Sequence, residues 1–483
     1  MAADRDRLQK AGDYDLDGAL IVGSSGQRVN VISQVKELNI FQSIDTPYMS
    51  GSILLTDSSG VAELLPLLGQ ERLLFTLKTP SHGGVVSFQD YHAIIYNVEY
   101  RFAGSDREQV LLVNWTTLDH YKNIRVKVSQ SFSGMISSIA QKLISDDDYL
   151  GSKKPINIEP TKNIRNFVIP NLNPFQAINL IKAEAVSMMM SPHYLFFENP
   201  EGYHFRSLDS LIGKAGSLSV KSKKTFKSQT GGGDPANIED SLSTLIGWKV
   251  EDNSNSFLST KLGMYGSTLY SHDIFNKNIQ KFEYDYIKDS FSKRNTTSQG
   301  SRSSGSLISG AKIDDKKTIT EFPESRIFVH PTASKEQYSP KIGTDNNADE
   351  WLQESESKKL ARDYFTLVLE CFGDTDVMVG DMIEVLIPSN KKLDKTASAN
   401  DPMLSGRYLI TSLNHLVIPT ETVHTMTMTV MKDSLTSGVS TKDTQYPSEP
   451  SGIADIGLSR TSRNLTAEPT KIRTVTANVG VRG

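Results

Sequence analysis

The sequence predicts a β-rich α+β fold, with two small antiparallel β-barrels, an α+β domain between them and a flexible C-terminal tail. Two regions rich in predicted strands, residues 15–119 and 360–434, flank a region with helical periodicity. The chain has 483 residues, which is the length of about three domains. Its hydrophobic fraction of 37% is low, which indicates long polar loops or tails.

The first predicted barrel spans residues 15–119, after an N-terminal arm of residues 1–14. Its candidate strands are rich in Val, Ile, Leu, Tyr and Phe, and clusters of Gly, Ser, Asp and Pro separate them. Six strands at this spacing are typical of a small antiparallel barrel or sandwich. They are Gly18–Val22, Val29–Ile40, Ser50–Thr56, Glu71–Thr79, Phe88–Tyr100 and Glu108–Thr116.

Residues 120–239 are predicted to be the first part of an α+β domain. Apolar residues recur at helical spacing between Phe132 and Ile144. Asn173-Pro174 then offers an N-cap and a first-turn proline for a second helix. The apolar stripe of that helix is expected to continue into Met188–Met190 as core. A hairpin follows at residues 194–206, and the Lys- and Ser-rich segment Lys221–Pro235 is predicted to be a surface loop.

The second predicted barrel is discontinuous and combines residues 240–269 with residues 360–434. Its later strands are expected at Tyr364–Phe372, Met382–Ile387, Arg407–Ile418 and Glu421–Met431. Residues 270–359 form the second part of the α+β domain and include a flexible loop at 290–320. Residues 435–483 are rich in Ser, Thr, Gly and Pro, so they are expected to form an extended tail that is disordered in isolation. We consider two roles for this tail, a peg that folds on a partner and a spacer.

No catalytic, cofactor-binding or metal site is predicted. The nine histidines form no His-Glu-x-x-His motif, and the glycine-rich segments lack a phosphate-loop pattern. His415 and His424 lie in facing predicted strands, and a structural pair on a sheet surface is the preferred interpretation. Glu198 and Glu201 flank a hairpin turn, so a glycosidase pair stays open. The lone cysteine, Cys371, lies in an apolar run and is expected to be buried.

Charge and hydropathy exclude several classes of protein. The formal net charge is −4 with no long run of like charges, which argues against binding of nucleic acid or membrane surfaces by the whole chain. No apolar run approaches 18 residues, so no membrane span is expected. The first nine residues are polar and show no signal peptide. The single cysteine cannot form an intramolecular disulfide, so synthesis in the reducing cytosol is expected.

Several segments resemble the central hub family of contractile-tailed phage baseplates, and they occur in the expected order. The longest, Asn39–Asp57, is followed by Leu65–Arg72 and Lys78–Pro80 and resembles the first hub barrel. The others are Val168–Asn171, Asn173–Phe175, Tyr203–Leu208, Gly263–Ser267, His272-Asp273, Gly380-Asp381, Leu404–Ile410 and Asn414-His415.

The resemblance implies a non-catalytic homotrimer in a virion baseplate, assembled in the host cytoplasm. Its six barrels would form a ring that joins the sixfold tail tube to the threefold spike and lets DNA pass. The implied partners are the spike protein, tail tube or tube-initiator proteins, and inner baseplate (wedge) proteins, with no specific nucleic-acid sequence. The alternatives are a hub of a bacterial contractile injection system and a tail-associated cell-wall hydrolase.

Three predicted strands are proposed to pair with another chain, because an exposed strand edge is a template for pairing. They are Ser50–Thr56 in the first barrel and Arg407–Ile418 and Glu421–Met431 in the second. The interface candidates on these strands are Ser50, Ser52, Leu54, Tyr408, Ile410, Thr427 and Thr429.

Overall fold

A computed structural model of the chain describes most of it up to residue 435. The described residues are 8–57, 60, 67–105, 108–162, 164–213, 222–228, 237–253, 255–273, 277–294, 296–298, 305–306, 316–332, 348–389 and 400–435. Apart from Leu435, the predicted C-terminal tail lies outside them.

The C-terminal strands form a closed six-stranded barrel. Its strands follow the order β14-β21-β22-β23-β20-β15, and β15 pairs with β14 to close the ring. Alternating side chains of these strands, such as Leu367, Leu369, Met428 and Val430, fill the interior because successive residues of a strand face opposite sides. The bounds are β14 (Thr225–Ser228), β15 (Thr244–Asn253), β20 (Phe365–Phe372), β21 (Met382–Leu386), β22 (Gly406–Ile418) and β23 (Val423–Met431).

The N-terminal strands form a second barrel with the matching order β1-β5-β7-β8-β4-β3, which is open because no pairing joins β1 to β3 among the described residues. Its core contains Phe75, Phe88 and Trp115, whose ring centroids lie 4.8 to 5.5 Å apart. Gly51 permits this packing, because a Cβ at that position would lie 2.4 Å from the Trp115 ring. The bounds are β1 (Asp15–Val22), β2 (Arg28–Asn30), η1 (Ile32–Gln34), β3 (Val35–Ser43), β4 (Ser50–Asp57), β5 (Arg72–Lys78), β6 (Val85–Ser87), β7 (Ala93–Ser105) and β8 (Glu108–Thr117).

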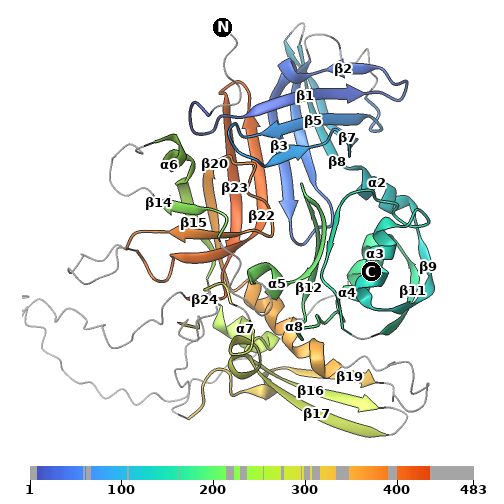
Figure 1. Ribbon diagram of the computed structural model, residues 1–483, viewed down its shortest axis with the longest axis vertical. Helices are drawn as coiled ribbons and strands as arrows, with labels where there is room; N and C mark the ends of the chain where they lie inside the picture. Colours follow the sequence, from blue (N-terminus) through green and yellow to red (C-terminus); the bar gives the residue numbers. More distant parts are fainter. Residues whose placement is uncertain are drawn as a thin grey trace, which may run out of the picture. The chain divides into compact units, whose positions relative to one another are not determined.

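The two barrels are joined by direct strand pairing within the chain. Strand β3 of the first barrel runs antiparallel to β22 of the second, with Leu38 opposite Val417 and Ser43 opposite Ser412. Figure 1 shows the blue strand β3 near the orange strand β22. Both barrels therefore belong to one continuous sheet.

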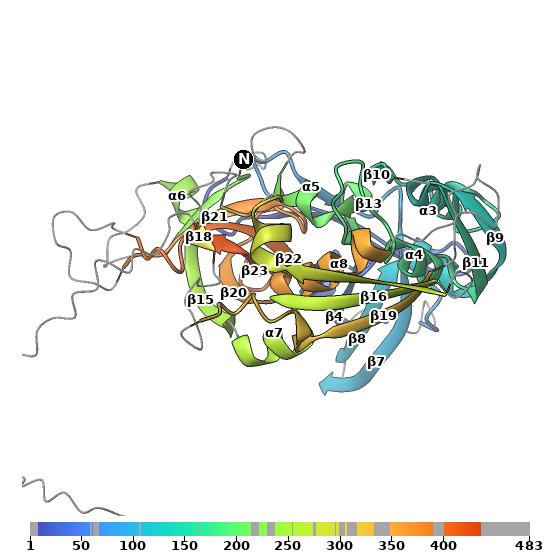
Figure 2. The same cartoon turned by 90° about the horizontal axis from the view of Figure 1, so that it is seen from below.

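The remaining helices and strands form two groups. In the first, helices α3 and α4 pack on strands β9 to β13 around a core that includes Phe175, Phe196 and Tyr203. In the second, helix α8 covers the sheet β17-β16-β19, as Figure 2 also shows. The first part comprises α2 (Leu118–Arg125), β9 (Val128–Gly134), α3 (Ile136–Ser145), β10 (Ile156–Ile158), β11 (Arg165–Leu172), α4 (Pro174–Lys182), β12 (Tyr194–Asn199), β13 (Gly202–Ser207) and α5 (Leu208–Ile212). The second part comprises α7 (Ser256–Leu262), β16 (Gly266–Asp273), β17 (Asn278–Asp285), η2 (Tyr286–Phe291), η3 (Pro323–Ser325), β19 (Ile327–Thr332) and α8 (Ala348–Arg362). Helix α6 (Ile238–Leu242) contacts β20 of the second barrel, and β18 (Gly305–Ser306) pairs with β24 (Ser434–Leu435).

Three details of the sequence prediction are wrong. Part of the predicted surface loop 221–235 is strand β14, which the second barrel needs for closure. Strand β16, assigned to that barrel, pairs instead with β17 and β19. Helix α4 ends at Lys182, and Met188–Met190 are exposed rather than core. There the Ser187 hydroxyl accepts the backbone N–H groups of Met189 and Ser191, which stabilises a turn in place of another helical turn.

Candidate functional site: the barrel junction and its free edges

Strand β22 contacts three other strands. Its first residues, 406–409, pair with β21, while residues 412–417 extend beyond β21 and pair with β3. Its other edge pairs with β23 from Leu409 to Ile418. Val417 packs into the core of the first barrel, and Ile44, just after β3, packs into the core of the second. The junction is therefore built by strand pairing and by shared apolar burial.

Because the strand orders of the two barrels match, β7 has the position in the first barrel that β22 has in the second. In the same way, β15 in the second barrel is the counterpart of β3 in the first. Strand β7 pairs with β5 only at Ala93 and Ile94, and beyond that point only with β8. Strand β15 pairs with β14 only at Thr244 and Leu245, and then only with β20. Among the described residues, no strand covers the remaining edge of either one.

Apolar side chains are exposed along these two free edges. Trp248 on β15 is 40% exposed and Ile246 is 54% exposed, while Tyr96 on β7 is 51% exposed. On the counterpart strand β3, Leu38 and Ile40 are at most 1% exposed because they face the core of the first barrel, whereas Phe41 on the opposite face is 43% exposed. Exposed aromatic and aliphatic residues beside an unpaired strand edge are typical of a protein interface.

The outward face of the joined sheet is polar and mostly uncharged near the junction. Asn114, Ser52 and Asn39 lie opposite one another on β8, β4 and β3. Asn39 donates to the Ser52 hydroxyl at 3.4 Å, and Asn414 on β22 donates to Asn39 Oδ1 at 3.4 Å. These short polar side chains run from β8 through β4 and β3 to β22, and the carboxylates of Glu37 and Glu99 accept hydrogen bonds from Asn39 and Asn114.

The three strands that were predicted from sequence to have exposed edges are paired with other strands of the same chain. Strand β4, with Ser50, Ser52 and Leu54, lies between β3 and β8, and β23, with Thr427 and Thr429, lies between β20 and β22. Tyr408 and Ile410 on β22 are fully buried, and the partner that β22 takes is β3 of the same chain. Because Ser50, Ser52 and Thr427 lie on the outward face, a role for them on an assembled surface stays a prediction.

The predicted pairing of His415 with His424 is confirmed, but both rings are buried rather than on a sheet surface. His415 Nδ1 and His424 Nε2 lie 3.1 Å apart, and both side chains are 0% exposed. Burial lowers the pKa of His415 to about 4 and places the pKa of His424 well below its usual range. Both rings are therefore neutral at physiological pH, and one hydrogen bond joins them.

Glu198 and Glu201 do not form a catalytic pair. Glu198 is 0% exposed and forms an ion pair with the buried Lys154, whereas Glu201 is exposed on the hairpin turn. Burial raises the pKa of Glu198, against the opposing effect of the Lys154 ammonium. Glu198 also accepts hydrogen bonds from Met49 N and the Thr117 hydroxyl, so it joins the first barrel to the α+β domain.

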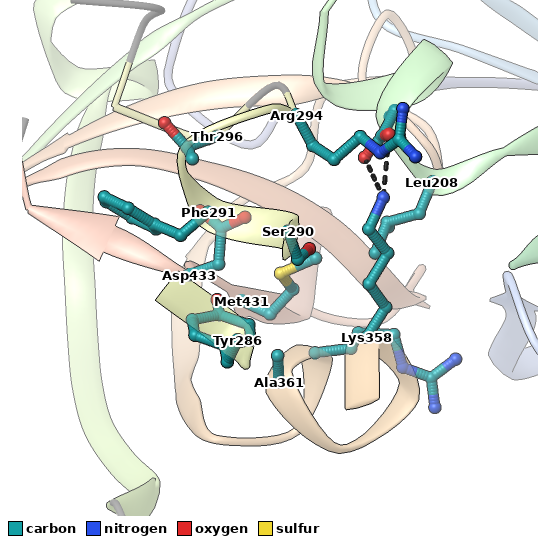
Figure 3. A pocket seen from close by; sticks show the side chains of 12 residues that line it. Leu208, Tyr286, Ser290, Phe291, Arg294, Thr296, Lys358, Ala361, Met431 and Asp433 are labelled. Atoms are coloured by element: carbon teal, nitrogen blue, oxygen red, sulfur yellow. Dashed lines mark hydrogen bonds and ion pairs between the residues drawn. The ribbon is translucent and has the colours of Figure 1, made fainter. Parts of the chain in front are cut away.

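A small cavity lies where α5, η2 and α8 meet the end of β23 (Figure 3). Lys358 reaches both carboxylate oxygens of Asp209 at 2.7 Å. Arg294 binds both oxygens of Glu354, at 2.7 and 2.9 Å. The cavity volume of about 20 Å³ holds about one water molecule, so this network serves as a buried joint rather than a ligand site. Cys371 is buried as predicted, and burial raises the pKa of its thiol.

Neither a protein-family model nor a curated protein matches the chain in sequence. Among solved structures, the tail protein from Neisseria meningitidis matches with a TM-score of 0.49 and 11% identity, over 87% of this chain and 97% of that chain. The prophage MuSo2 tail protein from Shewanella oneidensis matches with a TM-score of 0.48 and 9% identity, over 87% and 98%. The prophage tail protein gp18 from Listeria monocytogenes matches with a TM-score of 0.44 and 8% identity, over 86% and 94%.

Each of these TM-scores is below 0.5. Among the described residues, no helix is both long and apolar enough to span a membrane. Other solved structures to which the chain is similar are a Francisella PdpA-VgrG complex and an E. coli component of the type VI secretion system.

Proposed function

We propose that the chain is a non-catalytic structural hub of a contractile-tail baseplate, assembled as a homotrimer. The observation that carries the proposal is the pairing of β3 with β22, together with the two unpaired counterpart edges on β7 and β15. One chain already joins two barrels of matching strand order side by side. The same contact, repeated between chains, pairs β15 of one copy with β7 of the next.

This contact is heterologous, because it uses two different edges, and such contacts generate rings when the rotation closes. Each chain contributes eight strands to the joined sheet, in the order β7-β8-β4-β3-β22-β23-β20-β15. Three copies then close a cylinder of 24 strands with six barrels around it. At a strand spacing of about 4.8 Å, its backbone diameter is about 37 Å before strand tilt widens it.

The polar outward face of the sheet would line this cylinder. Asn39, Ser52, Asn114 and Asn414 offer hydrogen-bonding groups without positive charge. Binding of DNA to proteins depends chiefly on contacts of Lys and Arg with phosphates, so a wall of Asn, Ser and Thr holds DNA weakly. The lining therefore suits a channel through which DNA passes during ejection.

A ring of six similar barrels with threefold symmetry fits partners of two symmetries. One rim presents six near-equivalent barrels to a sixfold tail tube or its initiator proteins, and the other presents three copies of the α+β domain to a threefold spike. We assign the protein on this basis to the virion baseplate, next to the inner baseplate proteins, with assembly in the host cytoplasm.

The test uses one variant on each free edge. Trp248→Asp on β15 and Tyr96→Asp on β7 place a charge in the proposed contact, while both side chains are exposed in a single chain. We expect wild type to have three times the mass of one chain by light scattering, and each variant to be a folded monomer. Ile279→Asp is the matched control, because Ile279 is 61% exposed on β17, away from both edges.

Mixing the two variants sharpens this test. Trp248→Asp keeps an intact β7 edge, and Tyr96→Asp keeps an intact β15 edge, so an equimolar mixture should form dimers of one copy of each. A heterologous interface predicts dimers only in the mixture. Trimers of either variant alone, or a wild-type monomer, would contradict the proposal.

A further inference from the structure

The two barrels touch at a second place, where two loops meet. Residues 79–84 follow β5, and residues 374–377 follow β20. Thr79 N donates to Thr375 Oγ1 at 2.9 Å, and Thr375 N donates back to Thr79 Oγ1 at 3.1 Å. Thr375 Oγ1 also donates to the carbonyl of Gly84 at 2.6 Å. These reciprocal hydrogen bonds fix the two loops against each other.

Three groups that can bind a metal converge at this contact. His82 Nδ1 lies 2.9 Å from Asp374 Oδ1 and 3.3 Å from Asp376 Oδ2. One such atom from each residue lies within 4.8 Å of the other two. In a tetrahedral zinc site with bonds of about 2.0 to 2.1 Å, ligand atoms lie about 3.3 Å apart. The separations across the loops therefore match the spacing of a zinc ligand set.

The outer atom of each carboxylate is held by another group. Asp374 Oδ2 is paired with Lys224 Nζ at 2.5 Å, and Asp376 Oδ1 accepts the backbone N–H of Gly84. These contacts point Asp374 Oδ1 and Asp376 Oδ2 toward His82. Asp374 Oδ1 accepts one further bond, from Asp376 N at 3.0 Å. Outer contacts that orient the ligands are a regular feature of protein metal sites.

We propose that His82, Asp374 and Asp376 bind one Zn²⁺ that fastens the first barrel to the second. The Asp374 side chain is 1% exposed, which supplies a buried anionic ligand, and His82 is 19% exposed. A cavity of about 270 Å³ borders all three residues and leaves room for water as a fourth ligand. One imidazole with two carboxylates suits zinc, whereas calcium takes six to eight oxygen ligands.

The experiment uses the full-length protein after treatment with EDTA, titrated with ZnCl₂ in a calorimeter and followed by thermal unfolding. We expect one Zn²⁺ per chain and a rise in melting temperature, because zinc binds the folded state. His82→Asn keeps an N–H donor near the position of Nδ1 but removes the imidazole. It should melt like wild type in EDTA, bind zinc at least about tenfold more weakly and lose the rise.

Two further variants separate a zinc site from a plain ion-pair contact. Lys224→Gln removes a positive charge and releases Asp374 Oδ2, so it should lower stability in EDTA yet raise zinc affinity. His92→Asn, another histidine of the first barrel, should bind zinc like wild type. The inference is overturned if wild type binds no zinc, if His82→Asn binds it as tightly as wild type, or if Lys224→Gln fails to bind it more tightly. None of these outcomes depends on the mass of the assembled protein.

Discussion

Glu198 and Lys154 form a buried ion pair at the seam between the first barrel and the α+β domain. Both side chains are at most 6% exposed, and Ser152, Asp119 and Tyr203 extend the hydrogen-bond network around them. A buried charge is costly without its partner, so removal of one member leaves the other uncompensated. Sequence alone shows two ordinary charged residues here, because they are 44 positions apart in the chain.

Glu198→Gln should therefore lower the free energy of unfolding by about 3 to 5 kcal/mol. The double variant Glu198→Leu with Lys154→Met removes both charges and should recover most of that loss. Chemical denaturation measures both values. A loss below about 1 kcal/mol in the single variant would show that the pair does not hold this seam.

Buried neutral histidines make the stability depend on pH. Burial lowers the pKa of His193 to about 3, and the pKa values of His204 and His415 to about 4. The unfolded chain protonates these groups near pH 6.5, so between pH 6.5 and about 4 the unfolded state binds more protons. Stability should therefore fall as pH falls through this window, by about 1.4 kcal/mol per pH unit for each histidine.

His204→Gln isolates the share of one histidine. Its loss of unfolding free energy between pH 6.5 and pH 5 should be smaller than that of wild type by about 2 kcal/mol. Urea titrations at these two pH values supply the comparison. If the unfolding free energy of wild type and variant falls equally between pH 6.5 and pH 5, His204 is already charged in the folded protein.

At the scale of strands and helices, long alternating patterns were predicted well and short or shared elements were not. The pattern in Arg407–Ile418 and Glu421–Met431 marked the hairpin β22–β23 almost to its ends, because one face is core and the other polar. Strand β14 has only four residues in a Lys-rich segment, too few for an alternating pattern to appear. Strand β16 was recognised as a strand, but a strand pattern does not say which sheet a strand joins.

Free edges are equally hidden from sequence. Strands β4 and β23 were predicted to pair with another chain, but both lie between two neighbours of the same sheet. The unpaired edges on β7 and β15 arise because each strand extends beyond its neighbour, β5 or β14, with which it pairs over only two residues. The exposure of Trp248, which marks the β15 edge, is visible only in the structure.

The central place of β4 changes what a proline there does. Leu54 lies opposite Glu37 on β3 and Leu112 on β8, so Leu54→Pro breaks a sheet that continues on both sides. We expect this variant to lose the fold of the first barrel rather than to give a folded monomer. Circular dichroism melting and size exclusion separate these outcomes. A folded monomer would instead place β4 at an interface between chains.

At the scale of the whole molecule, the proposed assembly rests on one contact that is repeated between chains. The chain joins β3 to β22, leaves the counterpart edges of β15 and β7 without a partner strand among the described residues, and presents a polar face across both barrels. In the function that we propose, three copies would close that sheet into a cylinder whose wall would hold DNA weakly and whose rims would suit partners of sixfold and threefold symmetry.

The most direct measurement is an electron cryomicroscopy map of the purified wild-type protein. We predict a threefold ring of six barrels, in which β15 of each copy runs antiparallel to β7 of the next. Asn39, Ser52 and Asn414 should face the lumen of this ring. A single chain, or a ring in which the Trp248 and Tyr96 edges face solvent, would contradict it.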